Sequence, residues 1–117
     1  MVQIFKALSE ESRLRILSLF LEGGDLCVCE VEAILGMTQS NASRHLILLK
    51  NCGLLENYRK AQWMYYRLNQ TFISDNKELW DYLFAKLKAS KTYNADFNKL
   101  KVCRAADLCG CKRKKEK

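Results

Sequence analysis

Proline is absent from this sequence, histidine occurs only once and glycine only five times. No apolar run approaches the ~20 residues that cross a bilayer, so we expect no membrane-spanning helix. The N-terminus also lacks a signal-peptide pattern, which predicts a cytoplasmic protein without a membrane partner. The 117 residues suffice for one domain with a modest core.

The residue groups on which enzymes depend are missing as well. The sequence has no nucleophile–base pair, no glycine-rich phosphate loop and no carboxylate cluster. The lone His45 cannot build a histidine-based metal site with partners from its own chain. We therefore expect a binding protein that is not an enzyme and needs no organic cofactor.

Basic residues and cysteines are the functional groups that this sequence does offer. The net charge of +7 favours a polyanionic partner such as DNA, although residues 112–117 alone contribute +4 of it. Six cysteines in a chain expected in the reducing cytosol point away from disulfides. They favour metal ligands or redox-active thiols instead.

Apolar spacing predicts four helices in the first half of the chain. The first begins near Ile4 and the second covers residues 10–22, up to a pair of glycines. The third covers residues 27–35, and the fourth runs from an N-cap at Thr38 to residue 50. The link between the last two is as short as a helix-turn-helix requires.

Two strands, residues 54–59 and 63–69, follow around a polar tip. An Asp75 cap then begins a last long helix that ends near Ser90. Beyond Thr92 the pattern predicts at most a brief helical turn, and an irregular stretch follows.

This order of elements, α-α-α-α-β-β-α, predicts a mostly α winged helix-turn-helix over residues 1–91. Residues 92–117 are predicted to be a basic tail that contains cysteines. Apolar positions on the first and last helices exceed what one small domain can cover, which predicts a homodimer.

The fourth helix and the hairpin tip carry the predicted DNA contacts. Short polar groups near a helix N-terminus reach base edges in a major groove, and a cationic tip suits the DNA backbone or minor groove. For His45 the alternative is packing at the helix edge. The predicted contacts are Gln39, Ser40, Asn41, Ser43, Arg44 and His45 on the helix, and Arg59, Lys60 and Gln62 at the tip.

Cys27 stands where a Ser or Thr N-cap is expected, with Glu30 as its capping-box partner, and Cys29 falls in the first turn. The positive end of a helix favours thiolate, and soft thiolates select thiophilic ions. Residues two apart on a regular helix point about 200° apart. Both sulfurs can therefore meet one ion only if Cys27 stays extended or the first turn unwinds. The alternative is that both cysteines are buried and inert.

Residues 25–68, with DLCVCE, QSNASRHLILLKNCGLL and WMYYRL, resemble the ArsR/SmtB family of metalloregulatory repressors. The resemblance covers about residues 4–90 and is strongest to the arsenic- and cadmium/lead-responsive members, which carry ELCVC. It implies a homodimer, paired through its first and last helices, that binds a palindromic operator when apo and leaves it when metal binds. The family's zinc site on the last helix uses Asp and His ligands, and residues 75–90 contain no histidine.

The sequence does not decide which residue supplies the third ligand to the ion. Glu32 occupies the position where some arsenic sensors of this family carry a further cysteine. Three cysteines near the other end, Cys103, Cys109 and Cys111, either complete the Cys27/Cys29 site or form their own.

The number of sulfurs decides the expected ion. Three sulfurs favour As(III) or Sb(III), and four favour Cd(II) or Pb(II). As(III) is the predicted inducer of a repressor. A cadmium/lead-responsive repressor and a thiol redox or persulfide sensor are the alternatives.

Overall fold

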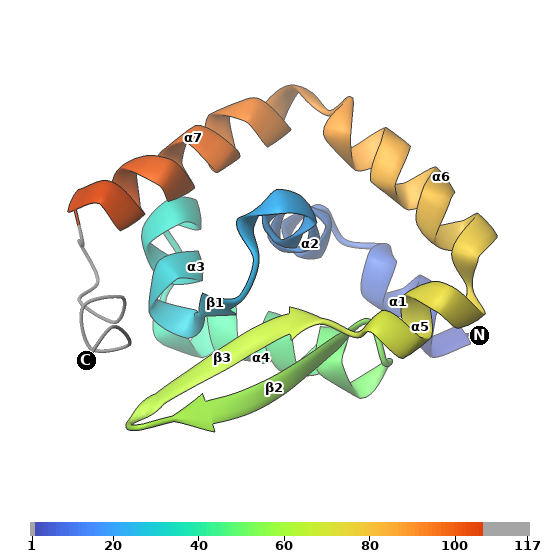
Figure 1. The fold of residues 1–117 in the computed structure, drawn as a ribbon, viewed down its shortest axis with the longest axis horizontal. Coiled ribbons are helices and arrows are strands. Elements are labelled where there is room, and N and C mark those ends of the chain that lie inside the picture. The colour runs from blue at the N-terminus through green and yellow to red at the C-terminus, as the bar shows by residue number, and fades with distance from the viewer. Residues whose placement is uncertain (1, 107–117) are drawn as a thin grey trace.

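The computed structural model describes residues 2–106, of which residues 22–23 and 105–106 are described by their backbone alone. Figure 1 shows helices arranged around a central helix, with a small sheet projecting to one side. The elements are α1 (Val2–Leu8), α2 (Glu11–Gly23), β1 (Leu26–Cys27), α3 (Val28–Leu35), α4 (Gln39–Asn51), β2 (Leu55–Lys60), β3 (Trp63–Leu68), α5 (Gln70–Asp75), α6 (Lys77–Lys88) and α7 (Lys91–Ala106).

Helix α2 is the centre of the core, and α1, α4, α6 and α7 all pack against it. Its Ile16 and Leu17 are completely buried, as are Leu46 and Leu49 of α4. Helices α3 and α4 pack against each other across the short turn at Gly36, which adopts a left-handed conformation with φ of 67°. The predicted helix-turn-helix is confirmed.

The sheet has three antiparallel strands in the order β1-β3-β2. The hairpin β2–β3 is the predicted wing, and its register sets Lys60 opposite Trp63 next to the turn. The additional strand β1 is only two residues long and ends at Cys27. Since Cys27 pairs with Tyr65 of β3, the wing is joined by strand pairing to the segment that begins α3.

The C-terminal third differs from the sequence-based prediction. Asn69 begins the separate helix α5, because its side chain accepts the backbone N–H groups of Thr71 and Phe72. The predicted long helix is α6, which begins after Asn76 and is not capped by Asp75. No helix within residues 2–106 has the length and apolar character needed to span a bilayer.

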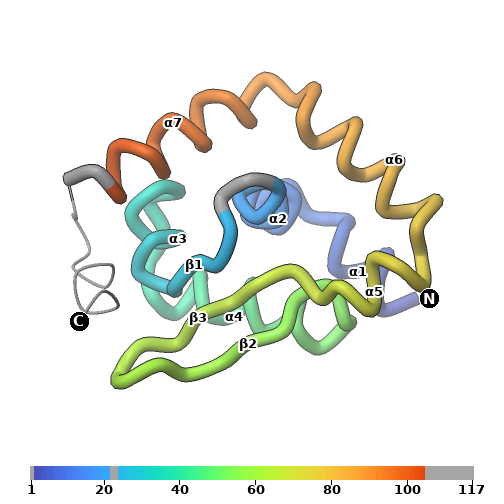
Figure 2. The backbone as a smooth tube through the Cα atoms, in the orientation of Figure 1, coloured from blue at the N-terminus to red at the C-terminus, as the bar shows by residue number. Residues whose placement is uncertain are grey.

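Residues 91–106 form the long helix α7, where the sequence predicted only a brief turn. This helix crosses over α2 and ends beside α3 (Figures 1 and 2). Its inward face contains Asp96, which is 2% exposed and accepts two bonds from Arg15 of α2, at 2.9 and 3.1 Å. These bonds raise the pKa of the Arg15 guanidinium. A bidentate pair of this kind fixes α7 onto the core.

Candidate functional site

Helix α4 presents the predicted reading face on its outer side. Thr38 caps the helix, and its Oγ1 accepts the backbone N–H of Asn41 at 3.2 Å. Ala42 and Leu46 are completely buried on the opposite face and hold the helix to the core. Ser43 is half-buried, and the other predicted contacts on this face are exposed: Gln39, Ser40, Asn41 and Arg44.

His45 does not belong to that outer face. Its side chain is buried, and Nδ1 lies 3.2 Å from Nη1 of Arg13 while Nε2 lies 3.5 Å from Oε1 of Glu10. Burial lowers the pKa of His45; the Glu10 carboxylate opposes this shift, and Arg44 and Arg13 add to it. A neutral imidazole whose Nδ1 accepts from Arg13 is consistent with this geometry. The prediction of a phosphate contact is replaced by the alternative, packing against the start of α2.

The wing tip is formed by the exposed residues Arg59, Lys60 and Gln62. Ala61 makes the turn with a φ of 57°, a backbone conformation that residues with a Cβ seldom adopt. The tip extends away from the helices (Figure 1), so its cations are free to meet a surface beyond the domain. Trp63 is half-buried at the tip, and its Nε1 is a buried atom for which the described residues supply no hydrogen-bond partner.

Cys27 is the N-cap of α3, as predicted, and its backbone is extended with φ −93° and ψ 164°. The capping box is complete: the Cys27 side chain accepts the N–H of Glu30, and Oε1 of Glu30 accepts the N–H of Cys27 at 3.0 Å. Cys27 is 1% exposed, whereas Cys29 in the first turn is half-buried. The extended Cys27 is the first of the two arrangements in which both sulfurs could face one ion.

Aromatic side chains of the wing surround the thiols. Cys27 and the buried Tyr65 form a small cluster, against which Cys29, Tyr58 and Trp63 pack. Tyr58 also donates its hydroxyl proton to Oδ2 of Asp25. Burial and this hydrogen bond together raise the pKa of Tyr58 to about 12. The thiol segment is thus held by the wing as well as by α3.

Helix α7 holds the same segment from the other side, a contact that the sequence analysis missed. Nε of Arg104 donates to Oε2 of Glu30 at 3.0 Å, and Nη2 donates to the backbone oxygen of Asp25 at 2.8 Å. Glu30 is 1% exposed, so this ion pair with Arg104 joins α3 to α7 inside the protein. The sequence predicted Glu30 only as the capping-box partner of Cys27, and nothing in its local pattern indicated the contact with Arg104.

The remaining predicted ligands are not assembled around this pair in the described structure. Cys103 is buried on the inner face of α7 and lines a pocket of about 310 Å³ with Ala33 and Ile34. Cys109 and Cys111 lie outside the described residues. Within residues 2–106 no three His, Cys, Asp or Glu side chains are arranged to hold a metal ion. Cys52 donates to the backbone oxygen of Leu49 at 3.3 Å.

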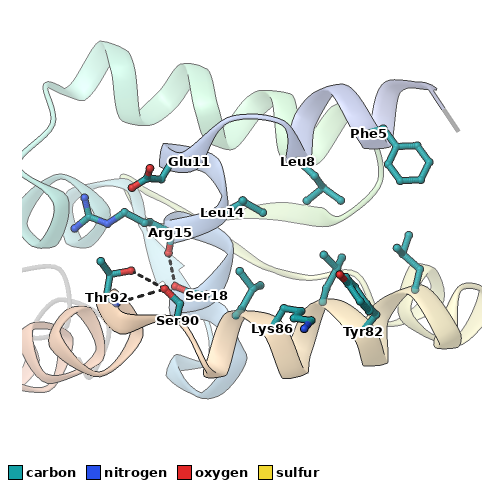
Figure 3. Close-up of a pocket in the computed structure, with 13 residues that line it drawn as sticks. Phe5, Leu8, Glu11, Leu14, Arg15, Ser18, Tyr82, Lys86, Ser90 and Thr92 are labelled. Atoms are coloured by element: carbon teal, nitrogen blue, oxygen red, sulfur yellow. Dashed lines mark hydrogen bonds between the residues drawn. The ribbon is translucent and has the colours of Figure 1, made fainter.

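A second feature of the molecule is an open, largely apolar groove of about 570 Å³ between α1, α2 and α6. Phe5 and Leu8 of α1 face Tyr82 and Lys86 of α6 across it (Figure 3). Phe5 is 53% exposed and Tyr82 61% exposed, although both carry large rings. Ser90, just before α7, and Thr92, in its first turn, close one end of the groove.

The helix-turn-helix with its projecting wing defines the class of winged-helix DNA-binding regulators. Residues 10–57 match the family model described as the bacterial regulatory protein, arsR family. The chain is 41% identical over 93 residues to the arsenic resistance transcriptional regulator ArsR2 of Pseudomonas putida, covering 80% of this chain and 78% of that protein. This protein therefore belongs to the ArsR family of transcriptional regulators.

Another relative and two solved structures are similar to smaller parts of this chain. The arsenical resistance operon repressor of Escherichia coli is 44% identical over 68 residues, which is 58% of each chain. This chain thus spans little more than half of that relative. Among solved structures, HlyU of Vibrio cholerae gives a TM-score of 0.58 at 34% identity, covering 72% of this chain and 90% of its own. A homodimeric winged helix-turn-helix domain from Mycobacterium bovis, Mb0332, gives 0.60 at 32%, covering 70% and 75%.

Proposed function

We propose that this protein is a dimeric repressor that binds a palindromic operator when free of metal and leaves it when Cys27 and Cys29 bind trivalent arsenic. DNA binding is assigned to Gln39, Ser40, Asn41, Ser43 and Arg44 of α4 and to Arg59, Lys60 and Gln62 of the wing. All of these residues are exposed except the half-buried Ser43, and this exposure supports the assignment. Buried His45 is left out of it.

The observation that carries the proposal is the position of the two thiols between the reading helix and the wing. Helix α3 packs against α4, and β1 pairs with β3. The backbone of Cys27 is already extended, but its sulfur is enclosed by the cluster around Tyr65 and accepts the N–H of Glu30, so ion capture is proposed to break both of these contacts. That change disturbs the support of α4 and the strand pairing of the wing together, so thiol capture and operator binding compete.

The third thiolate is proposed to come from the C-terminal end of the chain. Arg104 contacts Asp25 and Glu30, which places the end of α7 beside the thiol segment. Cys109 and Cys111 follow Arg104 by five and seven residues, a span of at most about 25 Å of extended chain. Three thiolates suit arsenite or antimonite. Cys103 is buried and lines a pocket with Ala33 and Ile34 of α3.

Homodimerisation is proposed through the groove between α1 and α6. The exposed rings of Phe5 and Tyr82 are apolar surface that a second copy would cover. A two-fold axis there would set two reading helices about 34 Å apart, one turn of DNA. Sedimentation analysis of Tyr82→Lys tests this: the variant should sediment as a folded monomer, and an unchanged dimer would contradict the proposed interface.

The proposed function is tested by titrating the operator complex, under reducing conditions, with arsenite, antimonite, cadmium, lead and zinc in turn. Arsenite should release the DNA and produce thiolate–metal absorption in the ultraviolet. Cys27→Ser should bind DNA normally and no longer release it. Cys52→Ser is the matched control, since Cys52 is the C-cap of α4 and does not belong to the cluster around Tyr65, and release should be unchanged.

Two further arms separate the alternatives. Replacing Cys109 and Cys111 with serine should raise the arsenite concentration needed for release; an unchanged response would remove the C-terminal thiols from the site. Release by cadmium or lead in place of arsenite would favour a Cd(II)/Pb(II) sensor. Release by an oxidant or a persulfide donor alone would favour a redox sensor.

A further inference from the structure

One buried carboxylate connects the C-terminal helix to the proposed inducer site. Oε1 of Glu30 accepts the N–H of Cys27, and Oε2 accepts Nε of Arg104. The same arginine reaches the backbone oxygen of Asp25 at 2.8 Å, just before β1. Arg104 thus holds both sides of the segment that bears the thiols.

We propose that Arg104 is a positioning residue that latches the Cys27–Glu30 capping box shut, and thereby sets how much inducer is needed to open it. This inference rests on the proposed function for the identity of the site, but the latch itself is a property of the metal-free protein. The predicted boundary after residue 91 would place Arg104 outside the domain, whereas the structure puts it against the first turn of α3.

The physical reason lies in the burial of Glu30. Its side chain is 1% exposed, and its carboxylate pairs with the Arg104 guanidinium, which is itself 26% exposed and compensates the buried charge. Removing the arginine leaves a carboxylate that gains by moving towards water. Glu30 can do so only by releasing the N–H of Cys27, so loss of Arg104 favours the opened cap.

The first test measures the accessibility of Cys27 without any metal. Reaction of the reduced protein with N-ethylmaleimide, followed residue by residue by mass spectrometry, reports how often the buried thiol becomes exposed. Arg104→Met should increase the rate at Cys27 by about tenfold or more, as expected for breaking a buried ion pair. Lys99→Met removes a charge from an exposed position of the same helix and should leave the rate unchanged.

A rescue experiment separates a latch from general destabilisation. In Glu30→Gln/Arg104→Met the amide oxygen can still accept the N–H of Cys27, and no buried charge remains. Cys27 reactivity should therefore fall back towards that of the original protein. An unchanged rate in Arg104→Met, an equal rise at Cys52, or no rescue in the double variant would each overturn the proposal. If Arg104→Met does not fold, Arg104→Lys replaces it. Lysine cannot bridge Glu30 and Asp25 together, so an intermediate rate at Cys27 is expected, and an unchanged rate overturns the latch.

The second test links the latch to induction. Arg104→Met should release operator DNA at a lower arsenite concentration than the original protein, by about the factor seen in Cys27 reactivity. If arsenite releases no DNA from any variant while Cys27 reactivity behaves as described, the proposed function fails and the latch stands. If arsenite acts normally and equally on both proteins, the latch fails and the proposed function stands.

Discussion

The two helices of the helix-turn-helix begin with the same kind of cap in very different surroundings. At α4, Thr38 is exposed and its hydroxyl accepts one backbone N–H, that of Asn41. At α3, Cys27 and Glu30 are buried, and the cap continues into Arg104 of α7 and the aromatic residues of the wing. The first cap shapes one helix, whereas the second joins three parts of the molecule. A switch is better placed at the second, because opening it reaches all of them.

The largest expected effect is at the buried cap. Glu30→Ala leaves the guanidinium of Arg104 without its carboxylate and the N–H of Cys27 without its acceptor. Breaking a buried pair costs about 3–5 kcal/mol of unfolding free energy. Urea unfolding followed by circular dichroism measures this loss. The contrast between the two caps breaks down if Glu30→Ala costs no more than Thr38→Ala.

A pH titration examines the buried side of α4. Because the pKa of His45 is lowered in the folded protein, the unfolded chain binds the proton more tightly. Stability is therefore complete above the unfolded pKa of about 6.5 and declines as the pH falls below it, by at most about 1.4 kcal/mol per pH unit. Protonated His45 would also be repelled by the Arg13 guanidinium, whose Nη1 lies 3.2 Å from Nδ1. The unfolding free energy measured between pH 7.5 and 5 should show this slope in the original protein and not in His45→Gln. An identical slope in both proteins would mean that another group causes the acid sensitivity.

The exposed cap should respond more weakly than the buried one. Thr38→Ala removes the acceptor of the Asn41 N–H, which water can replace. The expected loss is about 1 kcal/mol. The same urea series measures it, with Thr38→Ser as the control that keeps the hydroxyl. A loss as large as that of Glu30→Ala would show that exposure does not distinguish the two sites.

The smallest effect is expected at the wing tip, away from both caps. Ala61 adopts a φ of 57°, which asparagine tolerates better than alanine. Ala61→Asn should therefore raise stability by about 0.5 kcal/mol and leave Cys27 reactivity unchanged. Thermal unfolding detects the gain. A decrease in stability would contradict the strain assigned to this turn.

Much of the helix-turn-helix and the wing could be predicted from the sequence because each element has a local signal. Thr38 and the pair Cys27/Glu30 are caps recognisable from spacing alone, and both form as predicted. The outer face of α4 follows from helical periodicity once Leu46 and Leu49 are assigned to the core. These inferences need only neighbouring residues, which is why they succeed.

The C-terminal third required information from distant residues. The inward face of α7 includes Asp96, which looks like a solvent position until it is paired with Arg15 of α2. Tyr93, Leu100 and Cys103 recur at helical spacing on that face and are the signal that was available. The predicted DNA contact of His45 was wrong for a related reason. The burial of this polar side chain depends on its contacts with Arg13 and Glu10, which are distant in the sequence.

Helix α7 begins at the rim of the groove between α1 and α6 and ends at the thiol segment. Its 16 residues make a stiff rod of about 24 Å. A tilt at one end must therefore appear as a displacement at the other. Helix α7 thus connects the proposed dimer interface to the proposed inducer site. Thermodynamic reciprocity then requires that dimerisation and inducer binding, if coupled through this helix, change each other's affinity by the same factor.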